Sequence, residues 1–372
     1  MTRPVVLTGG GTGGHIFPMQ AIAEALVAEG VAEEDIRYVG SRRGQEADLL
    51  GCGPFALTLL PGRGLRRALS LSALRDNVSA LLALAGAVAR AVVLVGRWRP
   101  RVVISVGGYA AAAMGTATVL WRRPLVLVDL DATPSATHRL LAHFATTRCV
   151  ALGHAGEHVH VTGAPVRAHV RDLDRTPAER RRAKLALLVP IEPERRVVVV
   201  MTGSLGATRV NQAVLELAEL WHDREDLTLV HITGRRDFGM ISSAPLSPGV
   251  LDYRVLDFAD MGTWWAVADV AICRSGALTV AELTTLGLPA VLVPLPGAPG
   301  DHQTHNARAL CEVGAAVMVR DNECNGEALA RAVESILEPE RWAEMSRSSL
   351  QLARPDAARD IARVALSLMG ES

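Results

Sequence analysis

The sequence is poor in aromatic residues and in lysine, and it carries no net charge. Aromatic residues make up 4% of the chain while apolar residues make up 49%, so Ala, Val and Leu supply most of the apolar content. Such a composition is typical of parallel strands buried between helices. The formal charge is +0, and Lys184 is the only lysine. Without a basic excess the chain has no general electrostatic preference for nucleic acid, and we expect no such partner.

Paired cysteines are also missing. The five cysteines are scattered without a CxxC pair, which argues against a disulfide framework and a zinc site. Three histidines, His154, His158 and His160, could suggest a metal site, but no third ligand accompanies the two that share a strand face. A solvated strand is the preferred interpretation, so we expect no metal site and no cofactor.

No apolar run is long enough to cross a membrane. The most hydrophobic stretch, residues 78–96, contains Arg90, whereas a spanning helix needs roughly 20 apolar residues without such a charge. A core or amphipathic helix is expected instead, preceded by a basic segment that could meet anionic lipid or could simply cap a helix. The candidate membrane contacts in that segment are Arg63, Leu65, Arg66 and Arg67. The N-terminus runs into a predicted strand without a signal peptide.

Short β-branched runs alternate with helical patterns along the chain, which predicts βαβ units and parallel sheets. The charged, proline-containing segment 169–194 is the candidate linker between a first domain, 1–168, and a second domain, 195–354. A last helix in 355–372 could pack back on the first domain. The predicted strands are 5–9, 36–40, 55–59, 102–106, 125–129, 197–203, 227–234, 267–276 and 290–295.

Three glycine-rich turns follow predicted strands: GGGTGGH at 9–15, VGGYA at 106–110 and TGSLGATR at 202–209. Glycine allows a close backbone approach, and the helix that follows presents free N–H groups and a positive dipole end to a phosphate. None of the turns has the acidic residue of a dinucleotide fingerprint, and no Walker motif occurs. A dehydrogenase and an ATPase are therefore disfavoured, and a ligand with phosphates is favoured.

The stretch 268–310 combines a strand, a helix start and a polar loop. Glu282 is expected one turn inside the helix, where a carboxylate can bind the two vicinal hydroxyls of a ribose or simply stabilise the helix dipole. Gln303 offers a donor and an acceptor, which suits the hydroxyls of a sugar.

Seven motifs together resemble a known family. GGGTGGHIFP, VGSRRGQEADL, VGGY, TGAPVR, GSLGA, CRSGALTVAEL and DHQTHNA occur in the order seen in the MurG glycosyltransferases of family 28, over essentially the whole chain. The resemblance implies the α/β GT-B fold, with two Rossmann-like domains whose parallel sheets face a central cleft. It also implies an inverting, metal-independent hexosyltransferase that moves N-acetylglucosamine from UDP-GlcNAc to undecaprenyl-pyrophosphoryl muramyl-pentapeptide, forming lipid II for peptidoglycan.

The same resemblance implies partners and a location. The partners are UDP-GlcNAc, a polyprenyl-diphosphate-linked glycopeptide acceptor and the membrane surface, with the enzyme bound peripherally at the cytoplasmic face of the cell membrane. His15 resembles a histidine proposed as the general base, although it could equally position a phosphate. Gly107, Gly108 and Tyr109 form the expected acceptor or phosphate loop. The donor-site residues implied by the matching motifs are Thr12, Gly13, Gly14, Asp131, Arg167, Ser204, Gly206, Phe258, Ala277, Leu278, Thr279, Glu282 and Gln303.

Three segments depart from the family pattern. In VDLD at 128–131, Asp131 replaces an asparagine that helps to hold the donor sugar, and it could bind the sugar, cap a helix at Thr133–Pro134, or both. Leu205 replaces a glutamine in the third turn, and the second turn lacks a serine. These departures leave three alternatives: a diverged paralogue that glycosylates another lipid or natural-product acceptor, a UDP-sugar epimerase, or an inactive donor-binding subunit.

Overall fold

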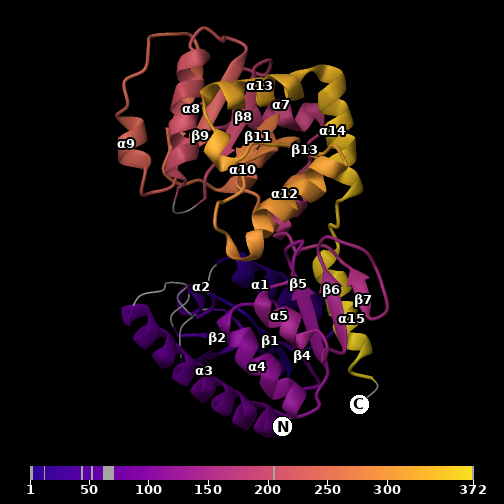
Figure 1. Cartoon of the computed structure of the whole chain (residues 1–372). Helices are drawn as coiled ribbons and strands as arrows, with labels where there is room; N and C mark the ends of the chain where they lie inside the picture. The colour runs from indigo at the N-terminus through magenta and orange to yellow at the C-terminus, as the bar shows by residue number, and fades with distance from the viewer. Residues whose placement is uncertain are drawn as a thin grey trace. The chain divides into compact units, whose positions relative to one another are not determined.

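The chain folds into two compact units, each a parallel sheet with helices on both faces (Figure 1). Unit 1 comprises Met1–Arg167 and Pro355–Ser372, and unit 2 comprises Ala168–Arg354. The predicted α/β class with two parallel sheets is confirmed. The computed structural model describes residues 3–11, 13–42, 45–51, 53–61, 71–203 and 206–370.

The sheet of unit 1 has, within its described residues, seven parallel strands in the order β3-β2-β1-β4-β5-β6-β7. The chain builds outward from β1 to β3 and then returns to place β4 beside β1. The turns after β1 and β4 therefore flank the point where strand order reverses, which is where open α/β sheets bind ligands. The strands are β1 (Val5–Thr8), β2 (Ile36–Ser41), β3 (Ala56–Leu60), β4 (Val102–Ser105), β5 (Leu125–Asp129), β6 (Thr147–Val150) and β7 (Val159–Val161). The helices are α1 (Gly13–Ala28), α2 (Glu46–Leu50), α3 (Leu71–Trp98), α4 (Tyr109–Leu120), α5 (Ala136–Leu141) and α15 (Ala357–Ser367).

Unit 2 repeats this arrangement, with six strands among its described residues in the order β10-β9-β8-β11-β12-β13. The strand order of this sheet reverses between β8 and β11, so the turns that follow these two strands are neighbours. The strands are β8 (Arg196–Met201), β9 (Leu227–Ile232), β10 (Asp252–Leu256), β11 (Val270–Cys273), β12 (Ala290–Leu292) and β13 (Ala316–Met318). The helices are α6 (Ala168–Arg171), α7 (Pro177–Ala186), α8 (Thr208–Leu220), α9 (Phe238–Ser242), α10 (Met261–Val267), α11 (Ala277–Leu286), α12 (His302–Glu312), α13 (Gly326–Leu337) and α14 (Pro339–Gln351).

The central strands read as unbroken valine runs because both of their faces are covered. In β8 the four residues 197–200 are all fully buried. Val198 and Val200 pack in one core cluster with Val214 and Leu217 of α8 and with residues of α13. The alternate valines face the opposite side of the sheet, so none of these four positions accommodates a polar side chain.

The segment 169–194, expected as a linker, instead belongs to unit 2 and contains α6 and α7. Several of its charges are solvated, with Arg182 and Glu194 each 80% exposed, but others are held against the unit. Arg180 forms an ion pair with Asp269, which is only 3% exposed. Arg175 donates hydrogen bonds to the carbonyl oxygens of Trp265 and Ala268, the latter at 2.8 Å. A charged composition suggested solvent, but a buried carboxylate and open helix carbonyls hold these residues against the unit.

The last helix, α15, belongs to unit 1 and contacts α1. Arg363 on α15 donates to Glu29 at 3.0 Å, just after α1 ends. The apolar stretch 78–96 lies within α3, which packs along α4. None of the helices in the described part of the chain is long and apolar enough to cross a membrane.

Candidate active site

The two glycine-rich turns of unit 1 touch each other beside β1 and β4. Gly10 and Gly108 have φ values of 131° and 90°, a region that favours glycine. A Cβ atom on Gly108 would lie 2.5 Å from the carbonyl oxygen of Gly10, so a larger residue would force the turns apart. The sequence analysis missed Glu46, which is fully buried beneath the first turn. Its Oε1 accepts hydrogen bonds from the N–H groups of Gly11 at 3.1 Å and Ser41 at 2.8 Å.

Helices that follow glycine-rich turns begin without a side-chain cap. The residues before α4, α8 and α11 are Gly108, Ala207 and Gly276, and none of their side chains accepts a hydrogen bond from the helix. An uncapped first turn leaves backbone N–H groups that ligand oxygens can satisfy. Helices α5, α7, α10 and α13 are capped by the side chains of Ser135, Thr176, Asp260 and Asn325, whereas α2, α9, α12, α14 and α15 also begin without a side-chain cap.

His15, Gly107 and Asp131, three residues predicted for the site, line one small cavity of unit 1 with a volume of about 30 Å³. His15 lies in the first turn of α1, and Gly107 lies in the turn after β4. A Cβ atom on Gly107 would be 3.4 Å from Nε2 of His15 and 4.0 Å from Cε1 of His138, so the glycine lets two imidazole rings approach. The cavity is large enough for a water molecule or a hydroxyl group.

A buried network of hydrogen bonds that no sequence motif indicated adjoins this cavity, and two of its members, Asp129 and His138, also line the cavity. His138 is 2% exposed and lies between Asp129, with Nδ1 2.7 Å from Oδ1, and Ser105, with Nε2 2.9 Å from Oγ. Arg148 donates to Oδ2 of Asp129 at 2.7 Å. Burial by itself would raise the pKa of Asp129, but the hydrogen bonds and charges of His138 and Arg148 outweigh it and lower the pKa below its ordinary value.

The loop that carries Asp131 ends in a capped helix. Ser135 is the N-cap of α5, and its Oγ accepts a hydrogen bond from the N–H of His138 at 3.2 Å. The capping role considered for Asp131 at this helix therefore falls to Ser135. Asp131 itself is half-buried at the cavity.

Other predicted residues of unit 1 are spread around the first turn. Gly13 and Gly14 begin α1, and the guanidinium of Arg167 lies 5.2 Å from the ring centre of Phe17 in that helix, a cation–π contact. Tyr109 is half-buried against the core of α3 and α4, and burial raises its pKa. The predicted residues Thr12, Arg63, Leu65, Arg66, Arg67 and Ser204 lie outside the described residues, as does Leu205.

In unit 2 a buried tryptophan orients Glu282. Trp265 on α10 is fully buried and donates its indole N–H to Oε2 of Glu282 at 2.9 Å, while Glu282 is 7% exposed. The carboxylate is thus fixed one turn inside α11, as the sequence predicted, but the partner that fixes it comes from another helix. The half-buried residues Ala277, Leu278 and Thr279 form the uncapped first turn of the same helix.

Gln303 joins two strand ends. Its Oε1 accepts from the N–H of Ser275 at 3.2 Å and from the N–H of Leu295 at 3.0 Å. Both partners are donors, which assigns the oxygen to this side of the amide. The side-chain oxygen of Gln303 therefore already accepts hydrogen bonds from the backbone. Its amide N–H groups are the part of the side chain that suits a sugar hydroxyl.

The third glycine-rich turn rests on a polar cluster. Gly206 has φ +78°, and a Cβ atom there would lie 2.7 Å from the carbonyl oxygen of Thr233 and 2.9 Å from Oδ2 of Asp237. The same Oδ2 accepts hydrogen bonds from Thr208 at 3.1 Å and from Asn211 at 2.9 Å. These residues fix the start of α8 from below.

A second buried histidine extends this cluster. Nε2 of His231 is 2.9 Å from Oδ1 of Asn211, and Nδ1 is 2.8 Å from the hydroxyl oxygen of Tyr253. Burial lowers the pKa of His231 to about 3, so this imidazole is neutral. It donates to Asn211 and accepts from Tyr253.

Unit 2 also carries an exposed aromatic residue and several arginines near its strand ends. Phe258 is 59% exposed, and the guanidinium of Arg235 lies 5.3 Å from its ring centre. Arg209 in α8 and Arg274 after β11 both pair with Asp321, at 3.4 Å and 2.7 Å.

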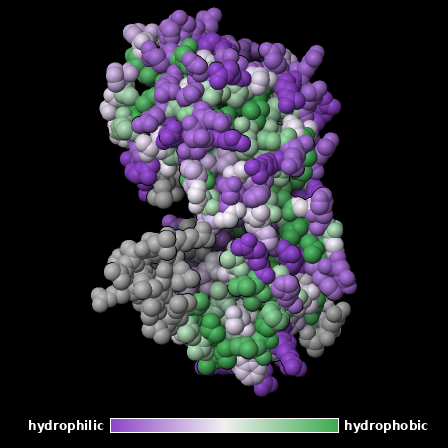
Figure 2. All heavy atoms as spheres, in the orientation of Figure 1, coloured by the Kyte–Doolittle hydropathy of each residue, from purple (hydrophilic) through white to green (hydrophobic). Residues whose placement is uncertain are grey.

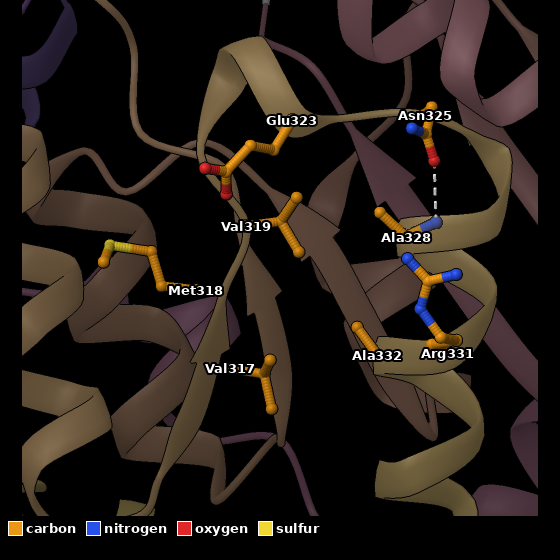
Figure 3. A pocket seen from close by; sticks show the side chains of 8 residues that line it. All are labelled: Val317, Met318, Val319, Glu323, Asn325, Ala328, Arg331 and Ala332. Carbon is orange, nitrogen blue, oxygen red and sulfur yellow. Dashed lines mark hydrogen bonds between the residues drawn. The ribbon is translucent and has the colours of Figure 1, made fainter.

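A wider hollow of about 620 Å³ lies along β13 and α13, and none of the predicted site residues lines it (Figure 3). Its polar groups already have partners: Oδ1 of Asn325 accepts from the N–H of Ala328 at 2.8 Å, and Arg331 pairs with Glu327 at 3.5 Å. Within the described ranges, no group of three His, Cys, Asp or Glu residues is placed to hold a metal ion.

Comparison with known proteins identifies the family. A model of the glycosyltransferase family 28 N-terminal domain matches residues 5–150, and a model of its C-terminal domain matches residues 197–361. The chain belongs to glycosyltransferase family 28. A family relative from Alkalilimnicola ehrlichii is 38% identical, with 98% of this chain and 99% of the relative covered. Another from Chlorobium luteolum is 37% identical, with 99% of each covered. Both are named UDP-N-acetylglucosamine–N-acetylmuramyl-(pentapeptide) pyrophosphoryl-undecaprenol N-acetylglucosamine transferase.

Solved structures place this family 28 chain in the GT-B fold. MurG of Acinetobacter baumannii superposes with a TM-score of 0.78 at 25% identity, covering 98% of this chain and 100% of that one. CalG4, the calicheamicin glycosyltransferase, gives 0.69 at 16% identity, with 99% of each chain covered. The second likeness shows the fold alone. The chain is a MurG-like glycosyltransferase, and the predicted GT-B fold is confirmed.

Proposed function

We propose that this family 28 glycosyltransferase transfers N-acetylglucosamine from UDP-GlcNAc to undecaprenyl-pyrophosphoryl muramyl-pentapeptide, with inversion and without a metal, to form lipid II. The observation that carries the proposal is the identity of 37–38%, over nearly the full length, to relatives named for this reaction. The uncapped helix starts and the cavity of His15 supply the chemistry that such a transfer needs.

In this proposal unit 2 binds the nucleotide. Glu282 accepts hydrogen bonds from the ribose hydroxyls, in the orientation set by Trp265. The first turn of α11, with Ala277, Leu278 and Thr279, offers N–H groups to the diphosphate. The amide of Gln303 donates to the N-acetylglucosamine, and exposed Phe258 covers the uracil.

Departure of UDP requires stabilisation of the charge that develops on the diphosphate. Without a metal this task falls to helix dipoles, backbone N–H groups and arginine. We assign it to Ser204 and Gly206 of the third glycine-rich turn, to the first turn of α8 that follows in the sequence, and to Arg167. The remaining donor contacts assigned to unit 1 are Thr12, Gly13, Gly14 and Asp131.

The acceptor hydroxyl must lose its proton as it attacks the sugar. His15 has an imidazole suited to this role near neutral pH, and it lines a cavity that admits a hydroxyl group. Gly107, Gly108 and Tyr109, at the start of α4, bind the acceptor diphosphate in this proposal.

A lipid-linked acceptor requires contact with the membrane surface, and we propose peripheral binding at its cytoplasmic face. Exposed apolar side chains gather where α3 and α4 pack: Val93 is 67% exposed, Leu120 66% and Trp121 46%. Trp121 is held there by a hydrogen bond from its indole N–H to the carbonyl oxygen of Val92 at 2.9 Å. Figure 2 shows hydrophobic atoms over these helices. Such an apolar surface suits contact with lipid, and in this proposal the basic residues Arg63, Arg66 and Arg67, which precede α3 in the sequence, bind anionic headgroups.

A second candidate function is transfer to a different lipid or natural-product acceptor by a diverged paralogue. The observation that favours it is the VDLD segment, because Asp131 puts a carboxylate at the cavity of His15.

The test is UDP release by the purified protein from UDP-GlcNAc, in EDTA, with and without a short-chain lipid I analogue. We expect acceptor-dependent release and a disaccharide product with an inverted anomeric centre. Turnover of UDP-GlcNAc without acceptor would indicate an epimerase or hydrolase. Donor binding without turnover would contradict lipid II synthesis, and a screen of other lipid-phosphate acceptors would then separate a paralogue from an inactive subunit.

A further inference from the structure

We propose that His138 is a positioning residue that holds both walls of the His15 cavity. The inference rests on the proposed function, because it takes His15 as the group that receives the acceptor proton. His138 also lines the cavity, but it is 2% exposed and both of its ring nitrogens have protein partners, so we assign it a role through the geometry of its neighbours.

The three anchors of His138 lie at the points where the cavity walls begin. Ser105 is the last residue of β4, and the turn with Gly107 follows it directly. Asp129 is the last residue of β5, and the loop with Asp131 follows it. The backbone N–H of His138 closes that loop by its hydrogen bond to Ser135. One side chain and its own backbone therefore tie the ends of two neighbouring strands to the start of α5.

Charged neighbours fix the hydrogen bond between His138 and Asp129 in one orientation. Arg148 binds Oδ2 of Asp129 through Nη2 at 2.7 Å and Nε at 3.2 Å, which leaves Oδ1 to accept from His138. The lowered pKa of Asp129 keeps it ionised, so Nδ1 of His138 carries the proton that it donates. Charge-assisted hydrogen bonds of this kind are short and roughly twice as strong as neutral ones.

The cavity depends on this geometry because His138 is bonded to the strand end from which the turn with Gly107 starts. Nε2 of His138 lies 2.9 Å from Oγ of Ser105, two residues before Gly107. The space at this turn is narrow, since a Cβ atom built on Gly107 would lie 3.4 Å from Nε2 of His15 and 4.0 Å from Cε1 of His138. Loss of the bond to Ser105 therefore releases the turn beside which His15 lies. Misplacement of a catalytic group by about 1 Å can cost about 100-fold in rate.

The test compares His138→Asn with His138→Leu in the full-length enzyme. An asparagine amide can donate to Asp129 from nearly the position of Nδ1, whereas leucine fills the space and donates nothing. We expect kcat to fall about 100-fold in H138L, with the Kd for UDP-GlcNAc unchanged within about twofold, and we expect H138N to restore most of the rate.

Two controls separate positioning from general destabilisation. Val95→Ala removes buried volume from α3 without touching the cavity, so it lowers Tm with kcat unchanged. His160→Asn makes the same chemical change as H138N at an exposed strand residue. An H138L variant that keeps its kcat would overturn the proposal. So would an H138N variant that folds but is as slow as H138L. If H138N instead changed the pH dependence of kcat, His138 would itself exchange protons, and positioning would again be wrong.

A second readout keeps the inference apart from the proposed function. The ring signals of His15 in ¹⁵N-labelled protein report the cavity even if the wild-type enzyme fails to use the lipid I analogue. We expect H138L to shift these signals and H138N to leave them close to wild type. If the wild-type enzyme is inactive but the signals shift in H138L and not in H138N, only the proposal of lipid II synthesis is wrong. If the His15 signals do not shift in H138L, the proposed role of His138 is wrong.

Discussion

Both units place two glycine-rich or polar turns where strand order reverses, yet the side chains beside those turns differ in kind. In unit 1 the turns meet titratable groups, because His15, Asp131 and the ionised Asp129 all line the cavity. In unit 2 the side chains are committed to orientation, as Trp265 holds Glu282 and the backbone holds the oxygen of Gln303. The same fold thus offers one site suited to proton transfer and another suited to holding a ligand still.

Two fully buried histidines show how neighbours decide this difference. His231 in unit 2 lies between the neutral groups of Asn211 and Tyr253, and burial lowers its pKa to about 3. His138 in unit 1 meets an ionised carboxylate at 2.7 Å. Two histidines that are buried to a similar extent therefore differ in role. His231 is neutral and bonds neutral groups, whereas His138 donates a charge-assisted hydrogen bond.

The largest expected effect separates the tasks of the two units. His15→Asn should lower kcat by about 100- to 10,000-fold, the range supplied by a general base, and leave the Kd for UDP-GlcNAc within about twofold. Steady-state rates and calorimetric titration of the donor measure the two quantities. Equal losses in rate and donor affinity would mean that His15 positions a phosphate.

The reverse pattern is expected in unit 2. Glu282→Gln should weaken UDP-GlcNAc binding by about 2 to 3 kcal/mol, or roughly 30- to 150-fold, because hydrogen bonds to a charged group are lost. Trp265→Phe keeps the carboxylate and removes only the N–H that orients it, so about tenfold is expected. Calorimetry with UDP-GlcNAc gives both values. A Kd unchanged in E282Q would remove Glu282 from the donor site.

Acid should destabilise unit 2 through His231. Its pKa is lowered from 6.5 to about 3 in the folded chain, so the unfolded chain binds more protons between these values. Stability is fully present above about pH 6.5 and falls as the pH drops towards 3, with a slope approaching about 1.4 kcal/mol per pH unit. Urea unfolding followed from pH 7.5 to 4.5 measures the slope, and His231→Gln should flatten it. An equal slope in H231Q would show that other groups dominate.

The smallest effect concerns the membrane surface. Leu120→Ser combined with Trp121→Ser in unit 1 should lower binding to anionic vesicles about tenfold, because the two partly inserted side chains together contribute on the order of 1.4 kcal/mol. Leu188→Ser, at a 101% exposed apolar residue of unit 2, is the matched control and should change nothing. Sedimentation with vesicles that contain anionic lipid measures the partition. If only Leu188→Ser lowered vesicle binding, the membrane contact would lie in unit 2 and not in unit 1.

The class of fold could be determined from the sequence by itself, because it shows in the spacing of apolar residues and in the composition of short segments. β-Branched apolar runs such as 197–200 and 102–104 are apolar on both faces, which is typical of a parallel sheet between helices. Strands β6, β10 and β13 were not predicted, since they are short or half-exposed and lack this pattern, and β7 was expected only as the solvated strand that carries His160. Composition also misjudged 169–194, whose charges find a buried partner in Asp269, about 90 residues away along the chain for Arg180.

The glycine-rich turns and Glu282 could be read from motifs, because each is a short local signal. The chain of Ser105, Asp129, His138 and Arg148 could not, since its members lie on β4, β5, α5 and β6 and no spacing connects them. Strand order brings these elements side by side, and burial then forces every polar group among them to find a partner. Local chemistry decided where a ligand can bind, and only the tertiary structure decided which side chains hold the binding site in shape.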